Sequence, residues 1–460
     1  MGPRENKLQK FLRQSSPTRI IVVSFVCMIL LGTVLLILPV SSRAGQFTDP
    51  VNALFTATST TCVTGLSVYD SYSYWSPFGQ AVLLVLIQCG GLGLSTFATA
   101  FTLLFRRRLG IRELTLVRES AGGSSLDVVA LLRIVVLFTL ACEAIGAGLL
   151  MIRFVPEYGS LGIWASVFAA VSAFCNAGFD LFSFVPGNAS LSAFNGDPLV
   201  TLTICGLIIV GSTGFVIFQD IYRKKMRPVF LRKPRERLSF HSQVCLYATG
   251  LLLAVGTVLI LIFEFNNTMR DLNFFEKLNA AFFQSVNTRT AGFCSVDIAA
   301  EKDVTKLVTI FLMFIGGCPA STGGGIKVTT AVVLVAAVKS TLTGEEDTVI
   351  LKHRFDGTMV SKALTVVALG LAIVALNTAL ITVLHENVET IDAVVEAVSA
   401  FATVGLTAGT TGKLGVLAKL MLSVTMFIGR VGPVSLGLAI LMRDRKKGGR
   451  ILPEGHMLIG

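Results

Sequence analysis

Eight long apolar stretches constrain the fold of this chain more than any other feature of its sequence. Each has about 20 mostly apolar residues, enough to cross the hydrocarbon core of a bilayer as a helix. They cover residues 20–38, 78–105, 127–152, 198–221, 243–263, 304–338, 361–384 and 415–442. Only 15% of the residues are charged and the mean hydropathy is +0.74, whereas about a quarter of a soluble domain is charged. We therefore expect an integral membrane protein.

Lysine and arginine cluster in segments that alternate with pairs of these stretches. The N-terminal tail (1–19), three linkers (106–118, 222–237 and 339–362) and the C-terminal tail (443–460) hold 27 of them, against 7 in the segments inside the pairs. Because cytoplasmic loops carry the basic excess, both termini and the linkers are predicted to be cytoplasmic. We interpret the net charge of +11 as membrane topology and contact with lipid headgroups, without a nucleic-acid partner. Docking of an acidic or nucleotide-binding cytosolic protein is compatible with it.

A fourfold internal repeat organises the sequence. Each pair of apolar stretches encloses a shorter apolar run, which is too short to cross a bilayer and is predicted to be re-entrant. Each run ends in a tetrapeptide whose third residue is glycine, and these glycines are 113, 114 and 113 residues apart (178 − 65, 292 − 178, 405 − 292). The tetrapeptides are Val63-Thr64-Gly65-Leu66, Asn176-Ala177-Gly178-Phe179, Thr290-Ala291-Gly292-Phe293 and Thr403-Val404-Gly405-Leu406. Four ordinary helix-packing glycines are the alternative interpretation.

The repeat predicts an all-α integral membrane fold of four units, each a span, a re-entrant pore helix and a second span. This fold has eight transmembrane helices and four pore helices in a pseudo-fourfold arrangement around one pore. The predicted segments are a cytoplasmic tail (1–19), four repeats (20–118, 119–237, 238–350 and 351–442) and a second cytoplasmic tail (443–460). Asp49 and Pro50 are predicted to be the N-cap and first-turn proline of the first pore helix.

The tetrapeptides are predicted to form a cation filter. A cation inside the bilayer loses its water, and backbone carbonyl oxygens can replace that water without adding charge. Glycine permits the backbone angles and close approach that such a lining needs, and the negative C-terminal end of each pore helix would face the cation. The predicted ion-binding residues are Val63, Thr64, Gly65, Asn176, Ala177, Gly178, Thr290, Ala291, Gly292, Thr403, Val404 and Gly405. One glycine per tetrapeptide, where a tetrameric potassium channel has two, predicts looser discrimination between potassium and sodium.

A glycine-rich run at residues 316–325 interrupts the second long stretch of the third repeat. Pro319 and five glycines cannot sustain a helix in lipid, so the run is predicted to unwind below the filter and gate it, with a passive kink as the alternative. An intramembrane arginine costs at least ~2.5 kcal/mol, so Arg430 is expected either beside the pore, bonded to carbonyls of the run, or paired with helix C-termini. Lys327 either orients the run or snorkels. The predicted gating residues are Gly316, Gly317, Pro319, Ser321, Thr322, Gly323, Gly324, Gly325, Lys327 and Arg430.

The remaining polar and sulfur-containing residues indicate no other site. The nine cysteines form no CxxC pair and mostly lie in apolar runs, so we interpret them as small buried residues; the four histidines are well separated. Potassium at the filter is the only predicted metal. Arg133 is expected to snorkel near a cytoplasmic end, and Glu143 to pair with backbone or a neighbouring polar group. The external segments lack the cluster of acids and histidines that a membrane enzyme needs, which predicts that the protein is not an enzyme.

These motifs resemble the Trk/Ktr/HKT superfamily of potassium transporters, most of all the bacterial Ktr membrane subunits of the B or D type. The resemblance covers nearly the whole chain. It is carried by the four tetrapeptides, the run Gly317-Cys318-Pro319-Ala320-Ser321-Thr322-Gly323-Gly324-Gly325-Ile326-Lys327, and Phe427-Ile428-Gly429-Arg430-Val431-Gly432-Pro433. It implies potassium uptake across the bacterial plasma membrane by a homodimer with one pore per protomer. Val63 and Asn176 stand where the other repeats have threonine, which puts a side-chain ion contact there in doubt.

The same resemblance implies regulation and selectivity. The expected regulator is a cytosolic ring of RCK subunits that bind ATP or ADP, so that nucleotide is bound only on this partner. The loop at 316–325 is implied to gate, Arg430 to help close it, sodium to stimulate uptake, and Gly460 to anchor the dimer interface. Glycine in all four tetrapeptides is the potassium-selective pattern of the family. The alternatives are sodium or ammonium conductance on the same scaffold, and a proton-coupled secondary transporter, which would need titratable residues along the path.

Overall fold

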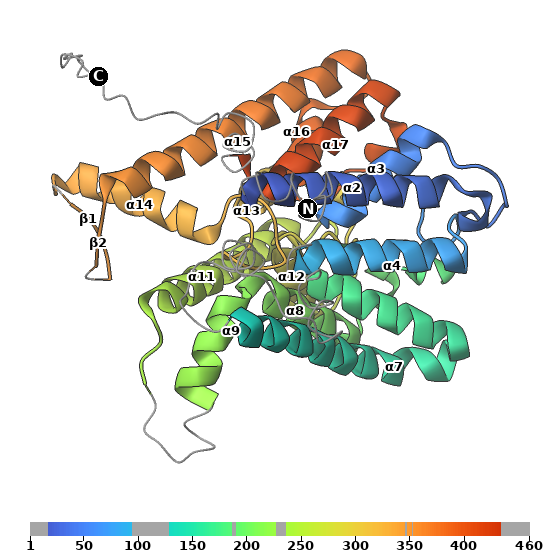
Figure 1. The fold of residues 1–460 in the computed structure, drawn as a ribbon, viewed down its shortest axis with the longest axis horizontal. Helices are drawn as coiled ribbons and strands as arrows, with labels where there is room; N and C mark the ends of the chain where they lie inside the picture. Colours follow the sequence, from blue (N-terminus) through green and yellow to red (C-terminus); the bar gives the residue numbers. More distant parts are fainter. Residues whose placement is uncertain are drawn as a thin grey trace, which may run out of the picture.

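The computed structural model describes residues 17–93, 128–185, 190–226, 236–345, 347–351 and 353–433. The described chain is mostly helical (Figure 1), as predicted. One short antiparallel hairpin, β1 (Thr348–Ile350) and β2 (His353–Phe355), departs from the all-α expectation. It lies in the linker 339–362, where polar residues interrupt the apolar pattern and leave the backbone free to pair with itself.

Three kinds of helix recur along the chain. Long helices begin each repeat: α2 (Pro17–Ile37), α7 (Val128–Cys175), α11 (Phe240–Glu264) and α15 (Gly357–Leu384). Shorter helices precede the tetrapeptides: α3 (Pro50–Cys62), the end of α7 after a kink at Gly159, α12 (Phe274–Asn287) and α16 (Thr390–Ala402). The helices that follow are α4 (Pro77–Leu92), α8 (Pro198–Thr213) with α9 (Phe215–Ile221), α13 (Asp303–Phe314) with α14 (Val328–Thr343), and α17 (Val416–Val431).

Short 3₁₀ and π segments connect these helices. They are η1 (Pro39–Ser41), η2 (Phe182–Phe184), η3 (Ser190–Phe194), η4 (Tyr222–Met226), η5 (Ile298–Ala300) and η6 (Thr411–Lys413). The first pore helix begins as predicted, because the Asp49 carboxylate accepts hydrogen bonds from the backbone N–H groups of Val51 and Asn52, 3.0 Å each, and Pro50 occupies the first helical position.

The long helices have the length and composition of membrane spans. Four helices are long and apolar enough to cross a bilayer by themselves, and α8 with α9 would make a fifth as one broken span. Leu30, Leu31 and Val34 of α2 are exposed, as are many apolar side chains of α11 and α15. Because water would not tolerate apolar faces of this extent, these faces fit the hydrocarbon of a membrane.

The helices that follow the tetrapeptides differ from the prediction of continuous spans. The predicted span 198–221 is broken by 95° between α8 and α9, at Gly214 with φ +94°. Likewise α4 ends before Gly93 (φ +78°) and α17 before Gly432 (φ +90°). Only glycine adopts such angles without strain, so a single residue stops each helix inside an apolar run. The continuations 94–105 and 434–442 lie outside the described residues.

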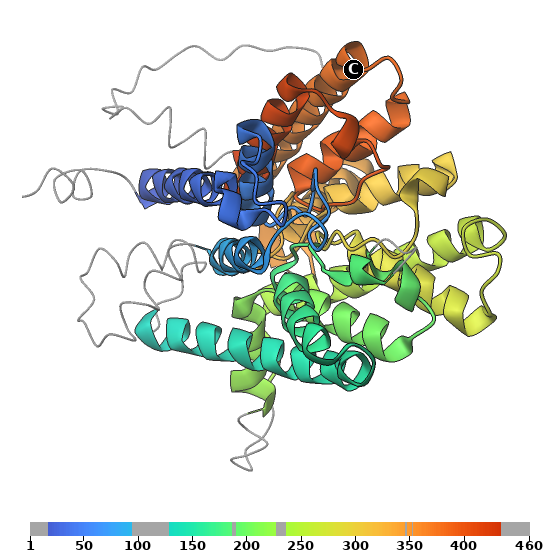
Figure 2. The same cartoon turned by 90° about the vertical axis from the view of Figure 1, so that its right-hand side faces the viewer.

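The predicted pore helices, α3, the end of α7, α12 and α16, pack into a closed circuit with the helices that follow each tetrapeptide. α4 contacts α7, α8 contacts α12, α13 contacts α16, and α17 returns to contact α3. Figures 1 and 2 show the consequence: the first helices in blue lie beside the last helices in red, around a common centre. Several of the largest fully buried side chains, Phe55, Phe168, Phe283 and Phe401, come from the helices that precede the tetrapeptides.

Candidate ion-conduction site

The four tetrapeptides meet at one point, and each glycine approaches a carbonyl of another repeat. The distances that follow run from the Cβ atom that an alanine would have at each glycine position to the nearest carbonyl oxygen. The nearest carbonyl oxygens are Ala177 O at 2.7 Å for Gly65, Ala291 O at 2.6 Å for Gly178, Val404 O at 2.3 Å for Gly292 and Thr64 O at 2.3 Å for Gly405. The contacts run from the first repeat through the fourth and back to the first. Side chains are excluded from this ring, and backbone lines it.

The backbone of the tetrapeptides has an unusual handedness. Their first residues, Val63, Asn176, Thr290 and Thr403, have φ between +51° and +65°, and their glycines have φ between +69° and +96°. A non-glycine residue held in this region costs of order 1–3 kcal/mol, and such residues gather at functional sites. When every second residue is left-handed, successive carbonyls point to the same side instead of alternating as in a strand. The geometry can therefore present several carbonyl oxygens to one cation.

The C-terminal end of each pore helix leads directly into its tetrapeptide. The N–H groups of Thr64, Ala177 and Val404 bond back to the carbonyls of Ser59, Ser172 and Ser399, at 2.7, 2.8 and 2.9 Å. This six-to-one closure is the Schellman cap of a helix C-terminus. In the third repeat the Asn287 side chain instead accepts from the N–H of Phe293 at 2.8 Å. The helix ends carry partial negative charge, which favours a cation at their meeting point.

A glycine-rich loop (residues 315–327) lies directly against the tetrapeptides. A Cβ on Gly323 would lie 2.6 Å from Thr290 Oγ1, one on Gly324 would lie 2.0 Å from Thr403 Oγ1, and one on Gly325 would lie 3.1 Å from Ala402 Cα. Thr322 Oγ1 donates to Asn176 Oδ1 or Phe174 O, both at 3.2 Å. Glycine at these positions is therefore required by space, because any side chain would push the loop away.

The break between α8 and α9 provides backbone partners for this loop. The N–H groups of Cys318 and Thr322 donate to the carbonyls of Ser212 (2.9 Å) and Gly211 (3.2 Å), and the N–H of Phe215 donates to Ala320 O (3.0 Å). A continuous helix would use these carbonyls internally. The sequence analysis predicted the unwound loop but missed the helix break. The two bond to each other, and each satisfies backbone groups that the other leaves free. The loop also closes on itself, as Gly316 N–H donates to Ile326 O at 2.8 Å.

Two cationic side chains hold the loop from different sides. Arg430 donates to Thr322 O of the loop and to the carbonyls of Gly90 and Gly91 at the end of α4. Its position therefore combines the two alternatives, contact with loop carbonyls and contact with a helix C-terminus. Lys327 Nζ donates to Gly323 O at 2.6 Å, which orients the loop. The other residues of the run, Gly317, Pro319 and Ser321, lie in the same loop.

Arg289 is a site residue that the sequence analysis did not single out. It is only 3% exposed, precedes Thr290 directly, and donates from Nη2 to Gly316 O at 3.4 Å. Comparison of the four repeats could have identified it, because Arg289 is charged whereas the residues before Val63, Asn176 and Thr403 are not. Arg289 joins the third tetrapeptide to the beginning of the glycine-rich loop.

The other predicted polar residues make no contact with the tetrapeptides themselves or lie outside the described part, although Glu143 contacts Cys175, the residue before the second tetrapeptide. Glu143 is buried and accepts a hydrogen bond from Gln88 Nε2 at 3.3 Å, so it pairs with a neighbouring polar group as expected. The basic run 106–108, Gly460 and the side chain of Arg133 fall outside the described residues. Within the described residues the cysteines are free, and no cluster of histidine, cysteine and acidic side chains could hold a metal.

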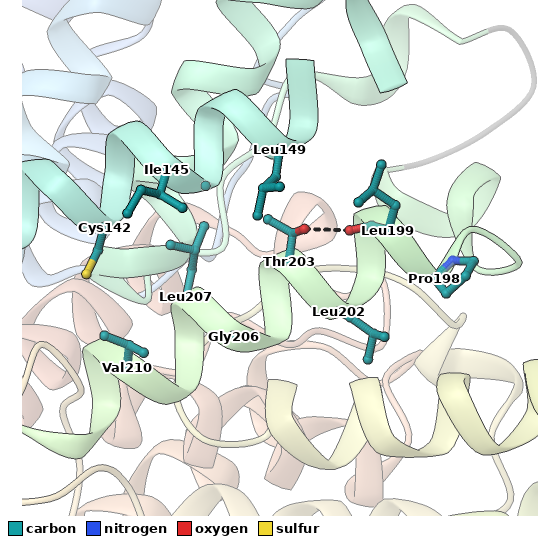
Figure 3. Close-up of a pocket in the computed structure, with 11 residues that line it drawn as sticks. Cys142, Ile145, Leu149, Pro198, Leu199, Leu202, Thr203, Gly206, Leu207 and Val210 are labelled. Carbon is teal, nitrogen blue, oxygen red and sulfur yellow. Dashed lines mark hydrogen bonds between the residues drawn. The ribbon is translucent and has the colours of Figure 1, made fainter. Parts of the chain in front are cut away.

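One groove between helices is apolar and separate from the tetrapeptides. It lies between α7 and α8, has a volume of about 560 Å³, and includes Ile145, Leu149, Leu202 and Leu207 in its lining (Figure 3). Ile145 and Leu202 are more than half exposed. The lining is almost entirely apolar, and its one hydroxyl, that of Thr203, donates to Leu199 O, so the groove lacks the set of oxygen ligands that would replace the water of a cation.

A buried acid outside the membrane-spanning helices predicts a pH effect on stability. Burial, and then the charge of Glu264, raises the pKa of the Glu301 carboxyl to about 8. The folded protein therefore favours protonated Glu301, and this contribution to stability is lost as pH rises from the ordinary pKa of about 4.5 through 8. We expect the Tm of the purified protein to fall less between pH 5 and pH 8 in Glu301→Gln than in the wild type. The exposed Glu386→Gln is the control, and equal slopes for all three proteins would contradict the assignment.

A buried, backbone-lined ring among apolar helices defines a class of protein, the membrane proteins that conduct or transport cations. Comparison with known proteins agrees. The sequence profile of the family TrkH, described as cation transport protein, matches residues 3–446, and the chain belongs to this family. The predicted resemblance and the prediction of a transporter instead of an enzyme are thereby confirmed.

Three relatives match this chain over nine tenths of its length or more. It is 38% identical over 467 residues to the Ktr system potassium uptake protein B of Bacillus subtilis, with 100% of both chains covered. It is 41% identical to the protein of the same name from Vibrio alginolyticus, covering 91% of this chain and 90% of the relative. It is 35% identical to the potassium/sodium uptake protein NtpJ of Enterococcus hirae, covering 97% and 98%. The crystal structure of the potassium transporter TrkH from Vibrio parahaemolyticus has the same fold, with a TM-score of 0.70, 18% identity, and coverage of 95% and 87%.

Proposed function

We propose that this protein takes up potassium across the bacterial plasma membrane through a pore lined by the four tetrapeptides. The observation that carries the proposal is the ring of glycine–carbonyl contacts that runs from Gly65 through Gly178 and Gly292 to Gly405 and closes on itself. Backbone carbonyls in such a ring replace the hydration shell of a cation. The names of the relatives, two potassium uptake proteins and one potassium/sodium uptake protein, support potassium as the main ion.

The proposed topology has eight transmembrane helices and four re-entrant pore helices, with both termini in the cytoplasm. The distribution of basic residues supports the orientation, and the recurring helix order supports the four units. The helices α4, α8 and α17 have 16 residues each, which rise about 24 Å against a hydrocarbon core of about 30 Å.

The glycine-rich loop is the proposed gate of this pore. It lies against Thr290 and Thr403, the first residues of the third and fourth tetrapeptides. Arg430, Lys327 and Arg289 hold it by hydrogen bonds to its carbonyls. Because these contacts and the three backbone hydrogen bonds to the break between α8 and α9 lie outside the regular hydrogen bonding of a helix, the loop can leave without unfolding one. The cationic groups also raise the barrier to a cation while the loop is in place.

Regulation is proposed to come from a partner subunit in the cytoplasm. The relatives belong by name to a Ktr system, which indicates more than one component. We propose a homodimer with one pore per protomer, bound to an RCK-type ring that carries the nucleotide. Stimulation by sodium is proposed as well, and the potassium/sodium uptake relative supports it.

Complementation of a bacterium that lacks its own potassium uptake tests the function. We expect cells that express the chain to grow at low potassium and to accumulate potassium, and purified protein in vesicles to pass it. The cells are tested with and without an RCK partner. Absence of rescue in both, together with vesicles that pass no monovalent cation, would refute the proposal. A sodium or ammonium conductor would pass that ion and leave the cells dependent on high potassium.

A further inference from the structure

A second closed set of contacts surrounds the tetrapeptides at the outer ends of the pore helices. Four buried polar residues, Gln80, Thr201, Lys306 and Lys419, are each the fourth residue of the helix that follows a tetrapeptide. Each bonds to a side chain on the pore helix of the next repeat. The bonds are Trp164 Nε1 to Gln80 Oε1 (2.8 Å), Asn279 Nδ2 to Thr201 Oγ1 (2.8 Å), Lys306 Nζ to Asp392 Oδ1 (2.8 Å) and Lys419 Nζ to Asn52 Oδ1 (2.9 Å). We call these four pairs the belt.

The register of the belt follows the internal repeat. Asn52, Asn279 and Asp392 each stand 13 residues before the glycine of their own tetrapeptide (65 − 52, 292 − 279, 405 − 392), and Trp164 stands 14 before (178 − 164). No residue type occupies all four equivalent positions: Lys306 and Lys419 are both lysines and Asn52 and Asn279 are both asparagines, but the other four residues all differ. A search for similar residues therefore does not reveal the belt, whereas the common geometry does.

The four pairs differ in chemistry and thus in strength. Two are neutral hydrogen bonds, and one joins an ammonium group to an amide oxygen. The fourth is an ion pair whose side chains are only 5% (Lys306) and 16% (Asp392) exposed. Removing one partner of a buried ion pair leaves an uncompensated charge and is strongly unfavourable. Lys306–Asp392 is therefore the pair on which the position of its pore helix, α16, depends most.

We propose that the belt positions the four pore helices and thereby sets how well the carbonyl ring discriminates potassium from sodium. The proposal rests on the proposed function. A pore helix is a rigid rod with the belt near one end and a tetrapeptide at the other, so a shift at the belt moves the carbonyls. Cavity size and the arrangement of the carbonyls determine which ion is coordinated. The belt residues act on the ion only through the pore helices and are positioning residues.

The ratio of potassium uptake to sodium uptake, measured in vesicles, tests the proposal. We expect Lys306→Met to lower this ratio by about three- to tenfold, which lies within the roughly two- to 150-fold that coupling between contacting residues produces. Lys306→Arg, which keeps the ion pair, should retain most of the ratio. So should the exchange of charges in the double variant Lys306→Asp with Asp392→Lys. The control is Lys302→Met, an exposed lysine near the same helix end.

A wild-type ratio in Lys306→Met, with normal protein in the membrane, would overturn the proposal. If this variant does not reach the membrane, Thr201→Val tests the proposal instead. It removes the hydroxyl that accepts from Asn279 Nδ2 at nearly constant side-chain volume. We expect it to lower the ratio about twofold, and an unchanged ratio would again overturn the proposal. The failure of the proposed function is distinct, since the wild-type protein itself would then pass no potassium.

Discussion

Replacing Gly292 with alanine is expected to lower potassium uptake at least tenfold. The added Cβ would lie 2.3 Å from Val404 O and 2.9 Å from the Cα of Gly405, and φ at this position is +74°. Neither neighbour is a flexible side chain, so the backbone of the ring itself would have to move. The strain of a left-handed non-glycine residue alone costs of order 1–3 kcal/mol, and 1.4 kcal/mol corresponds to a factor of ten.

The matched control for this prediction is Gly412→Ala. Gly412 lies in η6, where an added Cβ would meet no atom within 4 Å. Uptake is measured in potassium-depleted cells, with the amount of each variant in the membrane determined in parallel. Normal uptake by Gly292→Ala would show that the carbonyl ring is not the path of the ion, and the proposed function would fail with it.

Replacing Arg430 with glutamine is expected to increase potassium flux about tenfold or more in vesicles that lack a regulatory partner. Arg430 donates to Thr322 O on the loop and to the carbonyls of Gly90 and Gly91 on α4. Hydrogen bonds to a charged group contribute about 1.5–3 kcal/mol each. Their loss favours the state in which the loop has left the tetrapeptides, and it removes a positive charge beside the path.

Two further variants separate gating from a general loss of structure. Deletion of residues 316–325 removes the loop and should also raise the flux, whereas Arg270→Gln, an exposed arginine, should leave it unchanged. A lower flux in both Arg430→Gln and the deletion, with the proteins folded and inserted, would mean that the loop supports the pore and does not close it.

Much of the fold follows from local sequence patterns. Long apolar runs had to be buried in lipid, and they became helices such as α11 and α15, because a helix satisfies its own backbone groups there. The glycines of the tetrapeptides were visible as a repeat because one backbone conformation is needed four times. The unwinding at 316–325 was visible because proline and clustered glycines exclude a helix regardless of their surroundings.

The positions at which other helices end depend on residues that are distant in the sequence, so local patterns do not predict them. Gly93, Gly214 and Gly432 end helices inside apolar runs, while Gly211 and Gly429 lie within helices, so glycine alone does not predict a break. The break at Gly214 frees the carbonyls of Ser212 and Gly211, and these accept hydrogen bonds from N–H groups of the glycine-rich loop, about 100 residues away in the sequence.

The sequence by itself determined the membrane class, the four tetrapeptides and the family. Tertiary structure decided where the second helices end, that Arg289 is buried beside the loop, and that Lys306 and Lys419 face pore helices of other repeats. The physical reason is the range of the interactions. Hydropathy and backbone strain act within a few residues, whereas Lys419 meets Asn52 from the opposite end of the chain, and only the closed packing of four repeats brings such groups together.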